Sequence, residues 1–204
     1  MNPPNPFEPR FLAPFRRRLW VQWIDERVRE WGPELLRLRR LRELYLQGDP
    51  SIYYLTDFTL PVEIGALRTL RKLELLNLPI NFPEWIVNLP NLRYLMVRGT
   101  DATTVPDWIV RLKKLHTLRV ENCDLQALPH TLRQMDNLRH LSLCHTPLLP
   151  SLSPDQLPKR LKSLNILNSG HYQRPDLWEL KRALKGTHVN PDPDHATLWR
   201  ERPI

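Results

Sequence analysis

Cysteine is scarce in this sequence: only Cys123 and Cys144 occur among 204 residues. Two thiols are too few for the disulfide staples of many secreted proteins, which favours a reducing compartment. No stretch of 18 apolar residues is present, so we expect no membrane span. The first 15 residues hold five prolines and no continuous apolar run, unlike a secretory signal peptide. We therefore predict a cytoplasmic protein; the alternative is delivery into a host cell without such a signal.

The residue patterns of common catalytic and metal sites are also missing. There is no CxxC pair, the seven histidines lack zinc-site spacing, and the carboxylates are scattered. Cys144 adjoins His145, but no third group is placed to orient a base. His140 lies four residues from Cys144, roughly 13 Å away along a strand. We expect no enzyme activity, no cofactor and no metal.

A regular leucine pattern dominates what is present. The motif LxxLxL, with Val or Ile at some last positions, begins at residues 41, 70, 92, 115, 138 and 161. The spacings between these starts are 29, 22, 23, 23 and 23 residues. A fixed period of this length predicts a solenoid in which each repeat packs on its neighbours. The longest return, residues 50–60, carries an insertion with Tyr53, Tyr54 and Phe58, whose role the sequence leaves open.

The returns between motifs share a second pattern. A hydrophobic residue precedes proline, and aliphatic residues follow three and six positions later; the prolines are Pro61, Pro83, Pro106 and Pro129. Because proline fixes φ, each return starts at one defined point. Trp85 and Trp108 occupy the same slot in neighbouring repeats, and we predict that they stack side by side on the convex side.

The combined pattern, LPxxIxxLxxLxxLxLxxC/T, resembles the intracellular leucine-rich repeats of plant disease-resistance proteins. It is also similar to the Ras-scaffold type and to bacterial effectors that mimic it. The match covers roughly residues 41–169 and is best over 92–109 and 115–129. The resemblance implies an α/β leucine-rich repeat solenoid, a short horseshoe with a parallel sheet on its concave face. Resistance proteins carry a nucleotide-binding module, but this chain has no GxxxxGK[ST] loop, and such repeats alone do not define a function.

The repeat pattern divides the chain into four predicted segments. Residues 1–15 are a Pro-rich, flexible N-terminus, and residues 41–169 form about six repeats. Within 16–40, Trp20, Ile24, Val28 and Trp31 have helical spacing, which predicts an amphipathic N-terminal capping helix. Residues 170–204 comprise a C-terminal capping helix at 175–185 and a tail that wraps the last repeat or hangs free.

Partners are expected on the concave face. Strand residues alternate between the two faces, so the leucines leave three outward columns free on the surface that solenoids present to partners. Tyr, Met and Arg side chains, which are typical interface anchors, gather near its centre. The predicted protein-binding residues are Tyr45, Glu74, Tyr94, Met96, Arg98, Arg119, Glu121 and His140.

A basic column follows the first leucine of each repeat: Arg42, Arg71, Arg93, His116, Arg139 and Lys162. Such a column suits an acidic peptide or phosphates, but its members also fit there as solvated side chains. No aromatic residues are interleaved with it, which disfavours nucleic-acid binding.

The sequence therefore favours a monomeric, intracellular protein-interaction module, with defence or signalling as candidate settings. The alternatives are a pathogen effector with a regulatory or ubiquitin-ligase-linked role, and a binder of anionic surfaces. The partner stays open, as does the choice between a free repeat protein, a truncated receptor relative and an effector.

Overall fold

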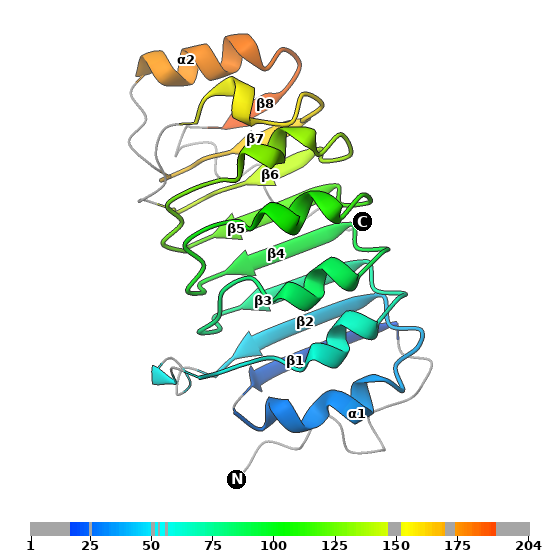
Figure 1. The fold of residues 1–204 in the computed structure, drawn as a ribbon. Helices are drawn as coiled ribbons and strands as arrows, with labels where there is room; N and C mark the ends of the chain where they lie inside the picture. Colours follow the sequence, from blue (N-terminus) through cyan, green and yellow to red (C-terminus); the bar gives the residue numbers. More distant parts are fainter. Residues whose placement is uncertain are drawn as a thin grey trace.

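The computed structural model describes residues 17–24, 26–49, 52, 54–55, 57–146, 152–169 and 174–190. Eight parallel strands form one sheet in chain order, and short helices lie across one of its faces (Figure 1). This arrangement is the predicted solenoid. The strands are β1 (Arg18–Ile24), β2 (Glu43–Gly48), β3 (Lys72–Leu76), β4 (Tyr94–Arg98), β5 (Thr117–Glu121), β6 (His140–Ser142), β7 (Ser163–Asn165) and β8 (His188–Asn190).

Each described return between strands contains at least one helix, and the return between β1 and β2 contains two. Pro61, Pro83, Pro106 and Pro129 stand at the N-caps of four of these helices, with φ between −72° and −57°. The proline pattern thus sets where each return turns, as predicted. The helices are η1 (Glu26–Trp31), α1 (Gly32–Leu35), η3 (Val62–Ala66), η4 (Glu84–Asn88), η5 (Asp107–Arg111), η6 (His130–Gln134), η7 (Pro154–Gln156) and α2 (Arg174–Ala183).

The core lies between the sheet and these helices. Equivalent leucines of successive repeats pair in register and point inward, each at most 1% exposed: Leu44, Leu73, Leu95, Leu118, Leu141 and Leu164. The aliphatic residues that follow the prolines, such as Ile86 and Ile109, are fully buried from the other side. Each repeat therefore buries its leucines only against its neighbours, as a solenoid requires.

The predicted N-terminal capping helix is wrong at its start. Residues 18–24 form strand β1, in which Leu19 and Val21 pair with Leu44 and Leu46 of β2 and are buried. Trp20 points to the opposite face and is 60% exposed. The extended conformation prevails because the free edge of β2 offers a row of unpaired backbone groups, which a parallel neighbour satisfies and a helix would not.

The C-terminal segment differs from the prediction in its last element. A helix is present as expected, α2, with Leu180 and Leu184 buried. The chain then returns to the sheet, where β8 pairs with β7, so a strand and not a helix completes each end of the sheet. The Pro-rich residues 1–15, the side chain of Asp176 and the tail after 190 lie outside what the structure describes.

Equivalent residues with positive φ follow the ends of strands β3 to β7, a feature that the sequence analysis did not predict. Asn77, Asn122, His145 and Asn168 all have φ between 51° and 55°, and Gly99 takes the equivalent place at 60°. Asn and Gly tolerate this left-handed conformation best. Strands β3 to β7 therefore turn away from the concave face at equivalent positions, which keeps the outward columns aligned.

Candidate functional site

The strand register places the predicted residues on one surface. Tyr45, Glu74, Met96 and Arg119 pair directly across β2 to β5 and form one column. Tyr94 lies in the adjacent column, and Arg98 pairs with Glu121 in the third. His140 stands farther along, between Thr117 and Ser163. The structure thus brings seven of the eight residues together over β2 to β5 and places His140 beside them on β6.

Lys72 occupies the centre of this surface. Its ammonium Nζ lies 4.4 Å from the centroid of the Tyr94 ring and 5.1 Å from that of Tyr45. The same nitrogen lies 3.0 Å from Glu74 Oε1. Lys72 therefore makes cation–π contacts with the aromatic rings of the repeats before and after its own, and its charge pairs with the carboxylate of Glu74.

The N-terminal side of the surface holds a second ion pair. Tyr45 Oη donates a hydrogen bond of 2.7 Å to Glu43, and Arg18 Nε lies 2.7 Å from the same carboxylate. Burial alone would raise the pKa of Glu43, but the hydrogen bonds from Arg18 and Tyr45 and the positive charges of Arg18 and Lys72 together outweigh burial, so the pKa is lowered. Burial, followed by the bond to Glu43, raises the pKa of Tyr45. Glu43 is thus charged and Tyr45 is neutral at pH 7.

Arg119 and Glu121 form a charged contact through two hydrogen bonds. Arg119 donates from Nε at 2.8 Å and from Nη2 at 3.2 Å to the two carboxylate oxygens of Glu121. Ser142 Oγ donates to the same carboxylate at 2.6 Å, and Arg119 Nη1 reaches Tyr94 Oη at 3.4 Å. Burial would lower the pKa of Arg119, but the hydrogen bonds and electrostatic attraction to Glu121 and Tyr94 together outweigh burial, so the pKa is raised. The charges of Arg119 and Glu121 are paired with each other and are not free to bind a partner.

Two predicted anchors are less accessible than the sequence suggested. Met96 and Glu121 are each only 6% exposed, and Met96 Sδ lies 3.7 Å from Tyr94 Oη. The strand register places Met96 and Glu121 on the concave face, but the larger side chains of Tyr94 and Arg119 cover them. Met96 and Glu121 form the floor of the surface, whereas Arg98 is exposed and Tyr45 and Tyr94 are partly exposed.

The sequence analysis missed Trp20 on this surface. Its ring centroid lies 5.7 Å from that of Tyr45 with an interplanar angle of 32°, and the side chain is 60% exposed. The alternation of Leu19 and Val21 with exposed neighbours was the available signal, and it indicates a strand. Trp20, Tyr45, Lys72 and Tyr94 together form a continuous concave aromatic cluster.

The thiol and imidazole groups show no catalytic arrangement. Burial raises the pKa of the Cys144 thiol, which contacts Ser142 Oγ at 3.3 Å, whereas His145 is exposed and contacts Asn168. Among the described residues, no three His, Cys, Asp or Glu side chains are placed to hold a metal ion. Within the same ranges, no helix has the length and apolar character needed to cross a membrane.

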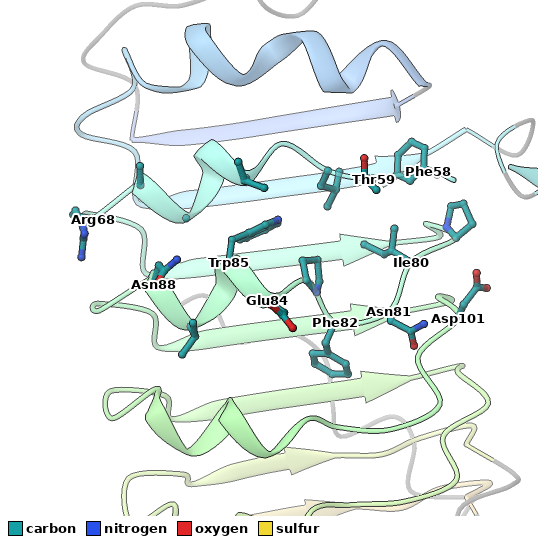
Figure 2. Close-up of a pocket in the computed structure, with 17 residues that line it drawn as sticks. Phe58, Thr59, Arg68, Ile80, Asn81, Phe82, Glu84, Trp85, Asn88 and Asp101 are labelled. Carbon is teal, nitrogen blue, oxygen red and sulfur yellow. The ribbon is translucent and has the colours of Figure 1, made fainter. Parts of the chain in front are cut away.

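The convex side carries a groove of about 1080 Å³ between η3 and η4 (Figure 2). Phe58, Ile80, Phe82 and Trp85 line it. The predicted stacking of Trp85 on Trp108 is wrong, since Trp108 packs edge-on against Phe82 with centroids 6.4 Å apart.

Gly65 allows Trp85 to approach the preceding repeat closely. A Cβ at Gly65 would lie 2.9 Å from the carbonyl oxygen of Trp85, so the absence of a side chain lets Trp85 lean onto the preceding repeat. From the insertion beside this groove, Phe58 is buried and Tyr54 is 90% exposed, whereas Tyr53 lies outside the described residues.

Comparisons with known proteins agree with this architecture. A family model described as a leucine-rich repeat region matches residues 83–184, which is half of the chain. The chain belongs to the leucine-rich repeat proteins. The more specific repeat type suggested by the sequence pattern stays a resemblance. Comparison with curated proteins gave no match.

Two solved leucine-rich repeat structures are similar in fold. A leucine-rich repeat protein of Leptospira interrogans superposes with a TM-score of 0.59 at 20% identity, covering 90% of this chain and 56% of that one. The leucine-rich repeat domain of the type III effector XopL gives 0.62 at 20% identity, covering 91% of this chain and 62% of that one. This chain thus spans only part of the length of either. At this identity the likeness supports the fold alone, and this fold typically serves as a scaffold for protein interaction.

Proposed function

We propose that this leucine-rich repeat protein is a protein-interaction module that binds its partner through the concave aromatic cluster. The observation that carries this proposal is the 60% exposure of Trp20 on a sheet face where its ring contacts Tyr45, which Lys72 links to Tyr94. Trp and Tyr supply large contact area with few rotatable bonds and dominate the energy of many protein interfaces. An exposed cluster of this kind favours a docking role over a purely structural one.

The rigidity of the surface supports the same role. Tyr45 is held by Glu43, and Tyr94 is held between Lys72 and Arg119. Side chains that are already ordered lose little conformational entropy when a partner binds. The central charges also pair within the chain, so the partner surface at this place is apolar and hydrogen-bonding, and not strongly charged.

We propose a biological setting for the module on the basis of the sequence pattern. We place the protein in the cytoplasm as a monomer, with defence or signalling as its setting. The second candidate is an effector delivered into a host cell, for which the similar fold of a type III effector domain is compatible. The buried Cys144, whose pKa is raised, gives no support to a thiol-based ubiquitin-transfer role.

The test compares partner capture by three forms of the chain. Trp20→Ala/Tyr94→Ala removes the aromatic cluster, while Tyr54→Ala removes an even more exposed aromatic side chain outside the concave face. Quantitative affinity enrichment from native cells is expected to lose the partner with the double variant and to retain it with Tyr54→Ala. Equal capture by the wild type and the double variant would place the site elsewhere.

A further inference from the structure

A row of basic residues marks the side of the solenoid where the strands begin. The turns that lead into the strands stack on the right-hand side of the view in Figure 1. Backbone hydrogen bonds join equivalent residues of successive turns, at 2.7 Å from Arg71 N to Arg42 O and 2.8 Å from Arg93 N to Arg71 O. Neighbours in this row are thus about 4.8 Å apart. The row extends the predicted basic column by one residue and comprises Arg17, Arg42, Arg71, Arg93, His116, Arg139 and Lys162.

Among the described residues, these basic side chains have no acidic partner in a salt bridge. All are exposed except Arg139, which is half-buried. Within the described ranges, no salt bridge joins any of the seven to a carboxylate. The concave cations Arg18, Lys72 and Arg119 are all paired. A continuous row of positive charge that is not paired within the described residues therefore lines this side.

More cations widen the row into a band. The six turns at residues 37–42, 66–71, 88–93, 111–116, 134–139 and 157–162 contain a single carboxylate, Asp136. We call the row and these turns the basic flank. Its further exposed cations include Arg39, Arg40, Arg68, Lys113, Lys114, Lys159 and Arg160.

The fold holds the basic flank in place despite the repulsion between like charges. Thr69 Oγ1 donates to Leu41 O at 2.7 Å, Asn91 Nδ2 to Arg68 O at 2.8 Å, and Asn137 Nδ2 to Lys113 O at 2.7 Å. Each bond ties one turn to the turn before it. The turns that carry the positive charges are therefore held at a fixed spacing.

The chemistry of the basic flank discriminates between classes of partner. The large exposed hydrophobic side chains of the described part are Trp20, Leu36, Tyr54 and Val62, and only Leu36 borders these turns. Protein interfaces need aromatic or apolar anchors, and single-stranded nucleic acids need aromatic side chains for stacking. A broad band of cations without either suits an anionic bilayer, where each Lys or Arg near the surface contributes without specific geometry.

We propose that the basic flank docks the solenoid edge-on to a membrane surface rich in anionic phospholipids. The strands then run away from the bilayer, because all of them begin at this flank (Figure 1). The concave face stands upright on the membrane and stays open to a protein partner. This role is independent of the proposed concave site, since the two surfaces share none of the cations that carry it.

Vesicle co-sedimentation of the full chain tests the proposal. The probes are vesicles of phosphatidylcholine alone and vesicles with about one-third phosphatidylserine. Binding is expected only to the second, and raising salt from about 0.1 M to about 0.5 M is expected to release the protein. Binding to both vesicle types alike, or no binding at low salt, would overturn the proposal.

Two variants locate the surface. Arg71→Gln/Arg93→Gln removes two exposed charges from the basic flank, and Arg98→Gln removes an exposed charge from the opposite end of strand β4. Each Lys or Arg near an anionic surface is worth about fivefold in partitioning, so the first variant is expected to bind about 25-fold more weakly. The second is expected to bind as the wild type does. Equal losses, or tighter binding of a DNA duplex or polyglutamate than of anionic vesicles at matched charge concentration, would contradict membrane docking.

Discussion

Arg119 was expected to be a binding anchor, but its contacts make it a structural residue as well. Its guanidinium pairs through two nitrogens with Glu121, whose side chain is only 8% exposed. Removing one partner of a buried pair leaves the other charge without compensation. At the scale of single residues, exposure and pairing therefore decide which concave side chains are free to meet a partner.

The Arg119→Ala variant is expected to lower the free energy of unfolding by about 2 kcal/mol, because Glu121 would keep a buried and unpaired charge. Arg98→Ala is expected to change it by less than about 0.5 kcal/mol, since Arg98 is exposed. Urea denaturation of both variants measures the difference. Similar stabilities for the two variants would mean that the Arg119–Glu121 pair contributes little.

His140 is expected to make stability depend on pH. Burial lowers its pKa below the ordinary 6.5, and nearby Lys162, His116 and Arg139 lower it further. The unfolded chain therefore binds more protons than the folded chain near pH 6, so stability decreases as the pH falls through the unfolded pKa. Thermal melts between about pH 5 and 7.5 should show a smaller slope for His140→Gln than for wild type. The exposed His130 supplies the control substitution, and an unchanged slope for His140→Gln would contradict this role.

Strand β1 is the element in which sequence and structure differ most. Trp20, Ile24, Val28 and Trp31 fit a helical period, but Leu19 and Val21 fit the strand period equally well. Short apolar segments allow both patterns, and the free edge of β2 decides between them. Local periodicity contains no information about that edge, so the sequence could not settle the choice.

A pair of substitutions distinguishes the strand from the helix directly. Leu19 is 1% exposed and Trp20 is 60% exposed. Leu19→Ala is expected to destabilise the fold by about 3 kcal/mol, and Trp20→Ala by less than about 1 kcal/mol. A helix with Trp20 on its buried stripe predicts the opposite order, which chemical denaturation would reveal.

The repeated elements were predictable for a simple reason. Leucines at positions such as Leu95 and Leu118, and prolines such as Pro106, are fixed by a packing requirement that recurs in every repeat. The recurrent Asn77, Asn122 and Asn168 were an equally visible signal of left-handed turns. The burial of Met96 was not predictable, because it depends on how the neighbouring side chains Tyr94 and Arg119 fold over it.

At the scale of the whole molecule, the two candidate surfaces differ in charge. The concave aromatic cluster lies among internally paired ions, whereas the basic flank has none of its positive row paired within the described residues. Raising the salt concentration screens exposed charges far more than it weakens apolar contacts. Added salt should therefore weaken binding at the basic flank far more than binding at the concave aromatic cluster, which makes their roles separable in one preparation.

Oxidative footprinting of the partner-bound protein tests the central claim most directly, because it reports the accessibility of individual aromatic side chains. The account predicts that Trp20 loses its reactivity in the complex while Tyr54, which is 90% exposed outside the concave face, keeps it. Full reactivity of Trp20 in the complex would contradict a partner site at the concave aromatic cluster.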